Sequence, residues 1–178
     1  MPKNPNSSDF VIGIIGAGAM GRGIAQIMAT GGMEVLLYDT SREAAEAGKE
    51  FAERMIFRAG EKGLMTDEEA QVAVKQLKVV TQLSDLAATD LIIEAVLEDL
   101  DIKREVFTSL ETIVAKDCIL VTNTSSLSVT AIASVMKYPG RFAGFHFFNP
   151  VPLMKVVEVV SGLETTQKTS EALVKIAS

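Results

Sequence analysis

The fold is decided at residues 11–21, which read VIGIIGAGAMG. The first half of this stretch is apolar and rich in β-branched residues, as in a buried strand, and glycines end it at once. After the glycines, the apolar residues Met20, Ile24 and Ile27 recur with the period of a helix. The pair Gly31-Gly32 can end that helix. We therefore predict a buried strand, a glycine-rich turn and a helix at the start of the chain.

The rest of the chain alternates strands with helices. Apolar runs predict strands over residues 35–38, 78–80, 91–96, 119–123, 142–147 and, at an edge, 156–160. Helical patterns occupy residues 41–77 with a break near 60–63, then 101–115, 127–135 and the segment from 166 onward. Strands this apolar indicate a parallel sheet covered on both faces. The helical stretch after the second strand is longer than a parallel crossover needs, so a pair of helices should project from the sheet, the second starting at the capping-box residues Thr66 and Glu69.

The glycine turn has the spacing of a dinucleotide-binding fingerprint in the strand–turn–helix context that gives the pattern meaning. Gly16 permits the tight turn, Gly18 lets a pyrophosphate approach the backbone, and Gly21 lets helix and strand pack closely. The pyrophosphate would lie on the free N–H groups of the helix N-terminus. Packing alone is the alternative role for three such glycines. The pattern favours a Rossmann-type α/β fold, a doubly wound, mostly parallel sheet with a projecting helical pair after the second strand. The predicted contacts to the cofactor are Gly16, Ala17, Gly18, Ala19, Met20 and Gly21.

Asp39 ends the second predicted strand. A carboxylate at this position can accept hydrogen bonds from the ribose hydroxyls of NAD and would repel the additional phosphate of NADP. Arg42 follows three residues later and could offset part of that repulsion, but a solvated surface arginine is the favoured explanation. The sequence therefore predicts NAD as the cofactor.

Polar residues gather where three later strands end. They are Glu94 and Glu98 after the fourth strand, residues 123–126 after the fifth, and His146 and Asn149 after the sixth. A single polar strand end can serve solubility alone. Ligands bind at the carboxyl edge of an open parallel sheet, so three successive polar strand ends indicate a binding site.

His146 is the single histidine of the chain and lies among aromatic residues. A lone histidine in such surroundings is often a hydrogen-bonded core residue. Glu158, however, lies beyond the bend imposed by Pro150 and Pro152 and is a suitable partner. A carboxylate on one imidazole nitrogen orients the ring and stabilises the imidazolium formed when the other nitrogen takes a proton. Such a base is what the oxidation of an alcohol requires.

Four segments resemble the 3-hydroxyacyl-CoA dehydrogenase family in its NAD-binding N-terminal domain. They are residues 16–26, 94–103, 123–127 and 146–158, and the stretches NTSSL and HFFNPVPLMKVVE are the most specific. The resemblance covers about residues 10 to 178. It implies that His146 is the catalytic base paired with Glu158. It also implies that Ser125 hydrogen-bonds the 3-oxygen of the substrate.

The resemblance implies further contacts to cofactor and substrate. Asp39 would hold the adenosine ribose, and the nicotinamide side would be contacted by Glu98, Lys103 and Asn149, with Asn123 and Ser125 beside them. Lys62 would meet the CoA phosphates, and Asn149 would also face the substrate. A serine that some relatives use for CoA is replaced here by Met55.

The resemblance also bears on domain organisation. We expect residues 1–9 to form a disordered tail and residues 10–178 to form the NAD-binding domain. Members of the family continue into a helical C-terminal domain that closes the acyl pocket and forms much of the dimer interface. These 178 residues are therefore expected to be a poorly active piece of an enzyme whose full-length form is a homodimer.

Composition excludes several other classes of protein. Seventeen basic and 23 acidic residues give a net charge of −6 without a basic run, which argues against nucleic-acid binding. The single cysteine, Cys118, excludes an internal disulfide and multi-cysteine zinc sites and is expected to be buried. No metal site and no membrane span are predicted. Residues 1–8 lack the pattern of a signal peptide, so a cytoplasmic protein is expected.

The favoured function is NAD-dependent interconversion of (S)-3-hydroxyacyl-CoA and 3-ketoacyl-CoA, in fatty-acid β-oxidation or related acyl-CoA metabolism. One alternative is another β-hydroxyacid dehydrogenase that uses NADP on a small free acid; Asp39 disfavours it. The other is a non-catalytic dinucleotide-binding or structural protein on the same fold. Joint retention of Ser125, His146 and Glu158 argues against lost chemistry.

Overall fold

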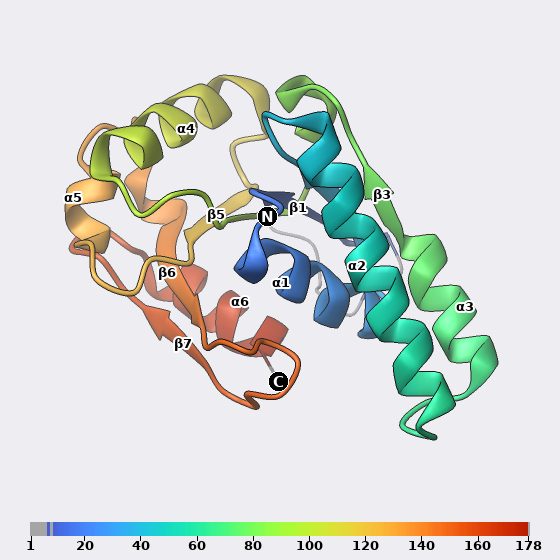
Figure 1. Ribbon diagram of the computed structural model, residues 1–178. Coiled ribbons are helices and arrows are strands. Elements are labelled where there is room, and N and C mark those ends of the chain that lie inside the picture. The colour runs from blue at the N-terminus through green and yellow to red at the C-terminus, as the bar shows by residue number, and fades with distance from the viewer. Residues whose placement is uncertain (1–6, 8, 178) are drawn as a thin grey trace.

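The computed structural model describes residue 7 and residues 9–177. Over these residues the chain forms a seven-stranded sheet in the order β3-β2-β1-β4-β5-β6-β7 (Figure 1). The strands are β1 (Val11–Ile15), β2 (Glu34–Tyr38), β3 (Leu77–Val79), β4 (Leu91–Glu94), β5 (Ile119–Thr122), β6 (Phe142–Phe147) and β7 (Val157–Val160). Of the predicted tail, residues 1–6 and 8 lie outside the described part of the chain.

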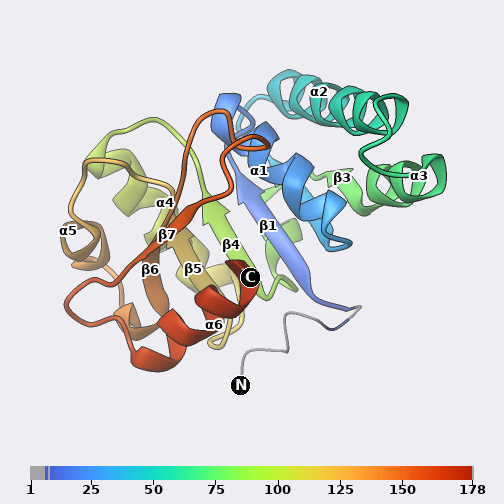
Figure 2. The same ribbon diagram turned by 90° about the horizontal axis from the view of Figure 1, so that it is seen from below.

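Helices cover both faces of the sheet (Figure 2). They are α1 (Ala19–Thr30), α2 (Arg42–Glu61), α3 (Asp67–Gln76), α4 (Leu100–Ile113), α5 (Val129–Ala133) and α6 (Gln167–Ala177), with the short 3-10 helices η1 (Leu83–Leu86) and η2 (Pro139–Arg141). Helices α1, α2, α3 and α6 contribute to one hydrophobic core, whereas α4, α5 and η1 contribute to the other. Because both faces are covered, the central strands are buried on both sides, which explains their nearly all-apolar sequences.

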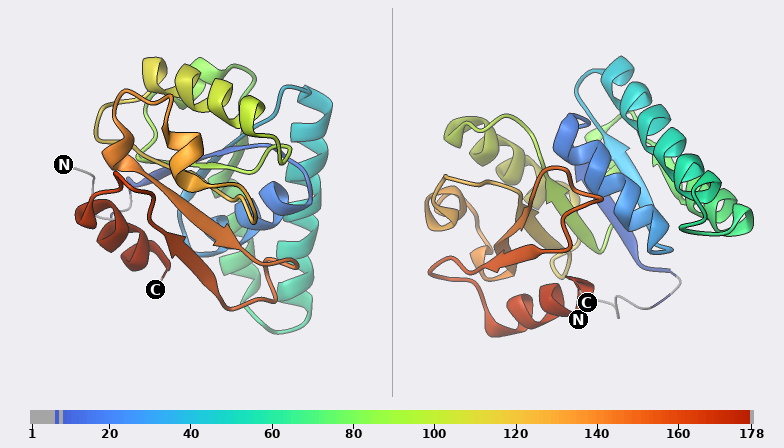
Figure 3. Two further views of the ribbon diagram at one scale, coloured as in Figure 1. Left: turned by 90° about the vertical axis from the view of Figure 1, so that its left-hand side faces the viewer. Right: turned by 60° about the horizontal axis from the view of Figure 1, so that its bottom comes forward.

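The predicted α/β fold is confirmed. All strand pairs are parallel except β6 and β7, which pair antiparallel at the edge of the sheet (Figure 3). The predicted helical pair is α2 and α3, which lie side by side beyond the β2–β3 edge (Figures 1 and 2). The capping box that starts α3 is present: the Thr66 N–H donates to the Glu69 carboxylate at 2.7 Å, and the Glu69 N–H donates to the Thr66 hydroxyl at 3.1 Å.

Two predicted elements are shorter than the sequence pattern indicated. The strand predicted over residues 91–96 ends at Glu94, because the N–H of Val96 turns back to donate to the Glu94 carboxylate at 2.7 Å. The helix predicted over residues 127–135 is shorter and starts after Ser128, whose hydroxyl accepts from the N–H of Ala131. In both places a side chain captures a backbone N–H and sets the boundary.

The turn between β1 and α1 separates the roles of its glycines. Gly16 has a φ of 96°, and a Cβ at this position would lie 2.5 Å from the carbonyl oxygen of Ala95. A Cβ on Gly21 would lie 1.7 Å from the carbonyl oxygen of Gly16, so the helix packs against the turn itself more closely than against β1. A Cβ on Gly18 would meet nothing within 4 Å. Gly16 and Gly21 are therefore needed by the fold, whereas the space above Gly18 is open to a ligand.

This difference predicts opposite effects of two matched substitutions. Gly21→Ala should lower the free energy of unfolding by about 3 kcal/mol, because the new methyl group overlaps a backbone oxygen that cannot move without opening the turn. Gly18→Ala should lower it by no more than about 1 kcal/mol, the cost of a weaker helix cap. Urea unfolding followed by circular dichroism measures both, and equal losses would contradict the division of roles.

Candidate active site

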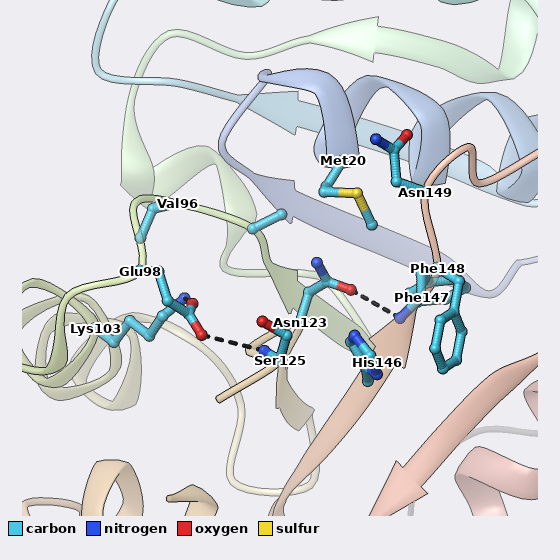
Figure 4. Close-up of a pocket in the computed structure, with 11 residues that line it drawn as sticks. Met20, Val96, Glu98, Lys103, Asn123, Ser125, His146, Phe147, Phe148 and Asn149 are labelled. Atoms are coloured by element: carbon cyan, nitrogen blue, oxygen red, sulfur yellow. Dashed lines mark hydrogen bonds and ion pairs between the residues drawn. The ribbon is translucent and has the colours of Figure 1, made fainter. Parts of the chain in front are cut away.

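The polar strand ends meet in one pocket of about 360 Å³ at the carboxyl edge of the sheet (Figure 4). Strands β4, β5 and β6 are parallel neighbours, with Glu94 opposite Thr122 and Thr122 opposite Gly144. The loops that follow these strands therefore emerge together. The pocket is lined by Met20, Ala95, Val96, Glu98, Lys103, Asn123, Ser125, His146, Phe147, Phe148 and Asn149. The structure thus brings together residues that the sequence predicted at three separate strand ends.

His146 and Glu158 form the predicted pair. They lie directly opposite each other in the antiparallel register of β6 and β7, which brings their side chains together. The Nδ1 atom of His146 lies 2.9 Å from Oε2 of Glu158, and the Phe148 ring packs against the imidazole with 4.5 Å between the ring centroids. The ring is thereby held at two points while the histidine lines the pocket.

Glu98 anchors the loop that carries Ser125. Its Oε1 accepts hydrogen bonds from the N–H of Ser125 at 3.1 Å (Figure 4), from the N–H of Ser126 at 3.3 Å and from the hydroxyl of Thr124. Burial acts to raise the pKa of Glu98, but the Thr124 hydroxyl and the ammonium group of Lys103 outweigh it and lower the pKa to about 2. Glu98 is therefore a carboxylate at neutral pH, already engaged with the protein on the pocket wall.

Lys103 lies on the first turn of α4 and is almost fully buried, with 1% of its side chain exposed. Its Nζ lies 2.7 Å from Oε1 of Glu94 and 3.2 Å from Oε2 of Glu98. The resemblance implies that Lys103 contacts the cofactor. The structure adds that its ammonium group already forms ion pairs with Glu94 and Glu98. The side chain of Glu94 is itself fully buried behind the pocket.

The amides of the site occupy different positions. The Oδ1 atom of Asn123 accepts a hydrogen bond from the N–H of Phe147 at 2.9 Å, which ties the end of β5 to the end of β6. Asn149 lies at the other end of the pocket from Glu98 and Lys103 (Figure 4). The pocket therefore spans the space between the β4–α4 loop and the segment that follows β6.

Asp39 lies beside the glycine turn, outside the set of described residues that line the pocket. Its Oδ2 accepts from the N–H of Ala17 at 2.8 Å, and its Oδ1 accepts from the N–H of Ser41 at 3.0 Å. The carboxylate thus links the end of β2 to the turn. Lys62 lies farther away still, exposed at the C-cap of α2 near the tip of the projecting pair (Figure 1).

Sequence reasoning missed one anchoring residue, Thr122, and named Thr124 among the polar residues after the fifth strand without assigning it an anchoring role. The hydroxyl of Thr122 donates to Oε2 of Glu94 at 2.6 Å, and the Thr124 hydroxyl donates to Glu98 and accepts from the N–H of Leu127. The signal for Thr122 was a threonine at the end of a buried strand. Threonine is common in strands because it is β-branched, whether or not a binding site lies nearby. Only the contacts reveal their roles.

Other expectations concern what lies outside the pocket. Cys118 is buried, and burial raises its pKa to about 12, as expected for a core residue. The described residues include no cluster of three or more potential metal ligands. Among them, no helix combines the length and apolar character needed to cross a membrane.

Comparison with known proteins identifies the family. A sequence profile described as "3-hydroxyacyl-CoA dehydrogenase, NAD binding domain" matches residues 11–178. The chain is 44% identical over 165 residues to 3-hydroxyadipyl-CoA dehydrogenase of Escherichia coli, covering 93% of this chain and 35% of that protein. It is 40% identical over 167 residues to the mitochondrial hydroxyacyl-coenzyme A dehydrogenase of Sus scrofa, covering 90% of this chain and 53% of that protein.

Solved structures point to the same family. The crystal structure of (S)-3-hydroxybutyryl-CoA dehydrogenase from Ralstonia eutropha superposes with a TM-score of 0.90 at 38% identity, over 94% of this chain and 59% of that one. The chain therefore spans between about a third and three fifths of the length of the relatives that it matches. With the profile match over nearly all its residues, the chain belongs to the 3-hydroxyacyl-CoA dehydrogenase family and matches its NAD-binding domain.

Proposed function

We propose that this chain performs the cofactor-binding and proton-transfer part of the NAD-dependent interconversion of (S)-3-hydroxyacyl-CoA and 3-ketoacyl-CoA. The observation that carries the proposal is the contact between His146 and Glu158 at the wall of a pocket that also contains Ser125. Fatty-acid β-oxidation or related acyl-CoA metabolism is the proposed setting. The acyl-CoA names of the relatives support this choice of substrate class.

His146 is the proposed general base. The contact of Glu158 with Nδ1 keeps the proton on that nitrogen and leaves Nε2 to accept the hydroxyl proton of the substrate. As the O–H bond breaks, its proton passes to Nε2, and the carbon–oxygen bond becomes a carbonyl. When bound, NAD would supply the acceptor for the hydride of the same carbon. Glu158 stabilises the imidazolium that results, and the reverse direction returns the proton to the new alcohol.

The other residues bind and orient the two ligands. The N-terminus of α1 above Gly18 would bind the pyrophosphate, and Asp39 would bind the adenosine ribose. The nicotinamide side of the cofactor would be held by Glu98, Lys103, Asn123 and Asn149, all of which line the pocket. Ser125 donates to the 3-oxygen of the substrate. Its backbone bond to Glu98 supports this role by holding the loop in place.

Capture of CoA rests on local charge in this proposal. The chain carries a net charge of −6, while substrate and cofactor are both anions. Lys62 at the end of α2 is the proposed contact for the CoA phosphates, and Met55 lies on the same helix. The single cysteine fits a reducing compartment, so the cytoplasm is the proposed location.

We propose that turnover needs residues beyond the segment that matches the relatives. In the Sus scrofa protein, the matched segment makes up 53% of the length. The residues beyond it would close the acyl pocket against water and form a homodimer. The 178 residues alone should bind NADH with an affinity close to that of the full-length protein but turn over little acetoacetyl-CoA. Fluorescence titration and an NADH-oxidation assay compare the two forms. Equal turnover by both would overturn this expectation.

Replacing the base gives a direct test of the chemistry. In the full-length protein, His146→Gln should lower kcat by about 10² to 10⁴, the usual contribution of general acid–base catalysis. NADH affinity should stay near that of the unaltered protein, because the imidazole is assigned to proton transfer. Acetoacetyl-CoA-dependent NADH oxidation measures turnover. If the rate survives undiminished, His146 is not the base.

The choice of NAD over NADP should depend on Asp39. Asp39→Asn keeps an oxygen for the N–H of Ala17 but removes the charge that repels the 2′-phosphate, so the preference for NADH over NADPH should fall about tenfold. Asp99→Asn is the matched control, because Asp99 caps α4 through the N–H groups of Asp101 and Ile102 at 3.0 Å. The control should leave the ratio of the two dissociation constants unchanged. A ratio equally unaffected by Asp39→Asn would rule out the assignment.

A further inference from the structure

A fully buried acid–base pair lies behind the pocket. Glu94, the last residue of β4, is 0% exposed, and Lys103 is 1% exposed, with 2.7 Å between Oε1 and Nζ. Removing two charges from water costs several kcal/mol per ion, and apolar residues of similar volume are often as stable as such a pair. Stability alone therefore gives a weak reason for this pair.

Every described contact of the Glu94 carboxylate leads toward the site. Oε1 accepts from Lys103 and also from the N–H of Val96 at 2.7 Å, which shapes the start of the β4–α4 loop. Oε2 accepts from the hydroxyl of Thr122 at 2.6 Å, at the end of the neighbouring strand. One buried carboxylate thus joins the ends of two strands and the first turn of α4.

Lys103 carries the connection from the core to the pocket wall. Its Nζ lies between Glu94 and Glu98, 3.2 Å from Oε2 of the latter. The other oxygen of Glu98 accepts from the N–H groups of Ser125 and Ser126. The chain of contacts runs without a gap from Glu94 to the loop of Ser125.

We propose that Glu94 is a positioning residue, which through Lys103 holds Glu98 and through Glu98 holds the Ser125 loop in the geometry that binds the cofactor. The inference rests on the proposed function of the pocket. Without the charge of Glu94, the ammonium of Lys103 keeps Glu98 as its one carboxylate partner among the described residues. The buried ammonium would then attract Glu98 more strongly, because Glu98 alone balances its charge. Glu98 would move away from the N–H groups of Ser125 and Ser126.

The test is the dissociation constant of NADH for the 178-residue chain, measured by fluorescence, together with the free energy of unfolding in urea. Glu94→Gln should weaken NADH binding about tenfold in a chain that still unfolds cooperatively. The matched control is Glu111→Gln, which breaks another buried pair: Oε1 of Glu111 lies 3.5 Å from Nη2 of Arg141, and the two side chains are 8% and 9% exposed. Arg141 precedes β6 at the opposite edge of the sheet, so this variant should lose stability and keep its NADH affinity.

A second pair of variants keeps the charges of Glu94 and Lys103 and tests the same role if Glu94→Gln does not fold. Thr122→Val removes the hydroxyl that holds Oε2 and should weaken NADH binding about threefold, whereas Thr122→Ser keeps the hydroxyl and should restore it. Recovery by serine separates positioning from general loss of packing, because serine packs less well than valine.

The outcomes separate this inference from the proposed function. If the unaltered chain binds NADH and Glu94→Gln or Thr122→Val binds it equally well, the positioning role is wrong and the proposed function stands. If Glu94→Gln and Glu111→Gln weaken binding alike in proportion to lost stability, the positioning role is also wrong. Absence of NADH binding by the unaltered chain would overturn the proposed function and this inference with it.

Discussion

The close approach of the first turn of α1 to the carbonyl oxygen of Gly16 is the contact on which the rest of the molecule depends. It leaves no room for a side chain at Gly21, and the bend at Gly16 leaves none against the backbone of Ala95. Because the helix begins at this point, its N-terminal N–H groups face the same edge of the sheet as the ends of β4, β5 and β6. The glycine turn and the polar pocket are thereby placed on one side of the protein.

The pocket places two kinds of carboxylate side by side. Glu158 is half exposed and holds one histidine nitrogen, an arrangement suited to a proton that moves. Glu94 and Glu98 are instead bound to an ammonium group, hydroxyls and N–H groups, an arrangement suited to holding backbone in place. The site therefore keeps the contact between His146 and Glu158 apart from two carboxylates that several partners hold in place.

Much of the fold followed from local pattern, because strand and helix periods, glycine turns and caps are properties of short segments. The capping box at Thr66 and the turn at Gly16 are examples that the structure confirms. Boundaries at residues 95–96 and 127–128 were wrong because side chains of Glu94 and Ser128 capture nearby N–H groups. The contact of His146 with Glu158 was also predictable, since a bend between two strands brings residues of opposite strands together.

The sequence by itself determined the strand–turn–helix start, the polar strand ends and the resemblance that named the residues of the site. Tertiary structure alone decided how those residues are engaged: Lys103 between the buried carboxylate of Glu94 and the exposed carboxylate of Glu98, Thr122 and Thr124 as anchors, and Asp39 bonded to the turn. The physical reason is the distance along the chain between the interacting residues. Periodicity reports which face of an element is buried, whereas a hydrogen bond between the ends of β4 and β5 joins residues 28 apart in the chain, and only the register of the sheet brings them together.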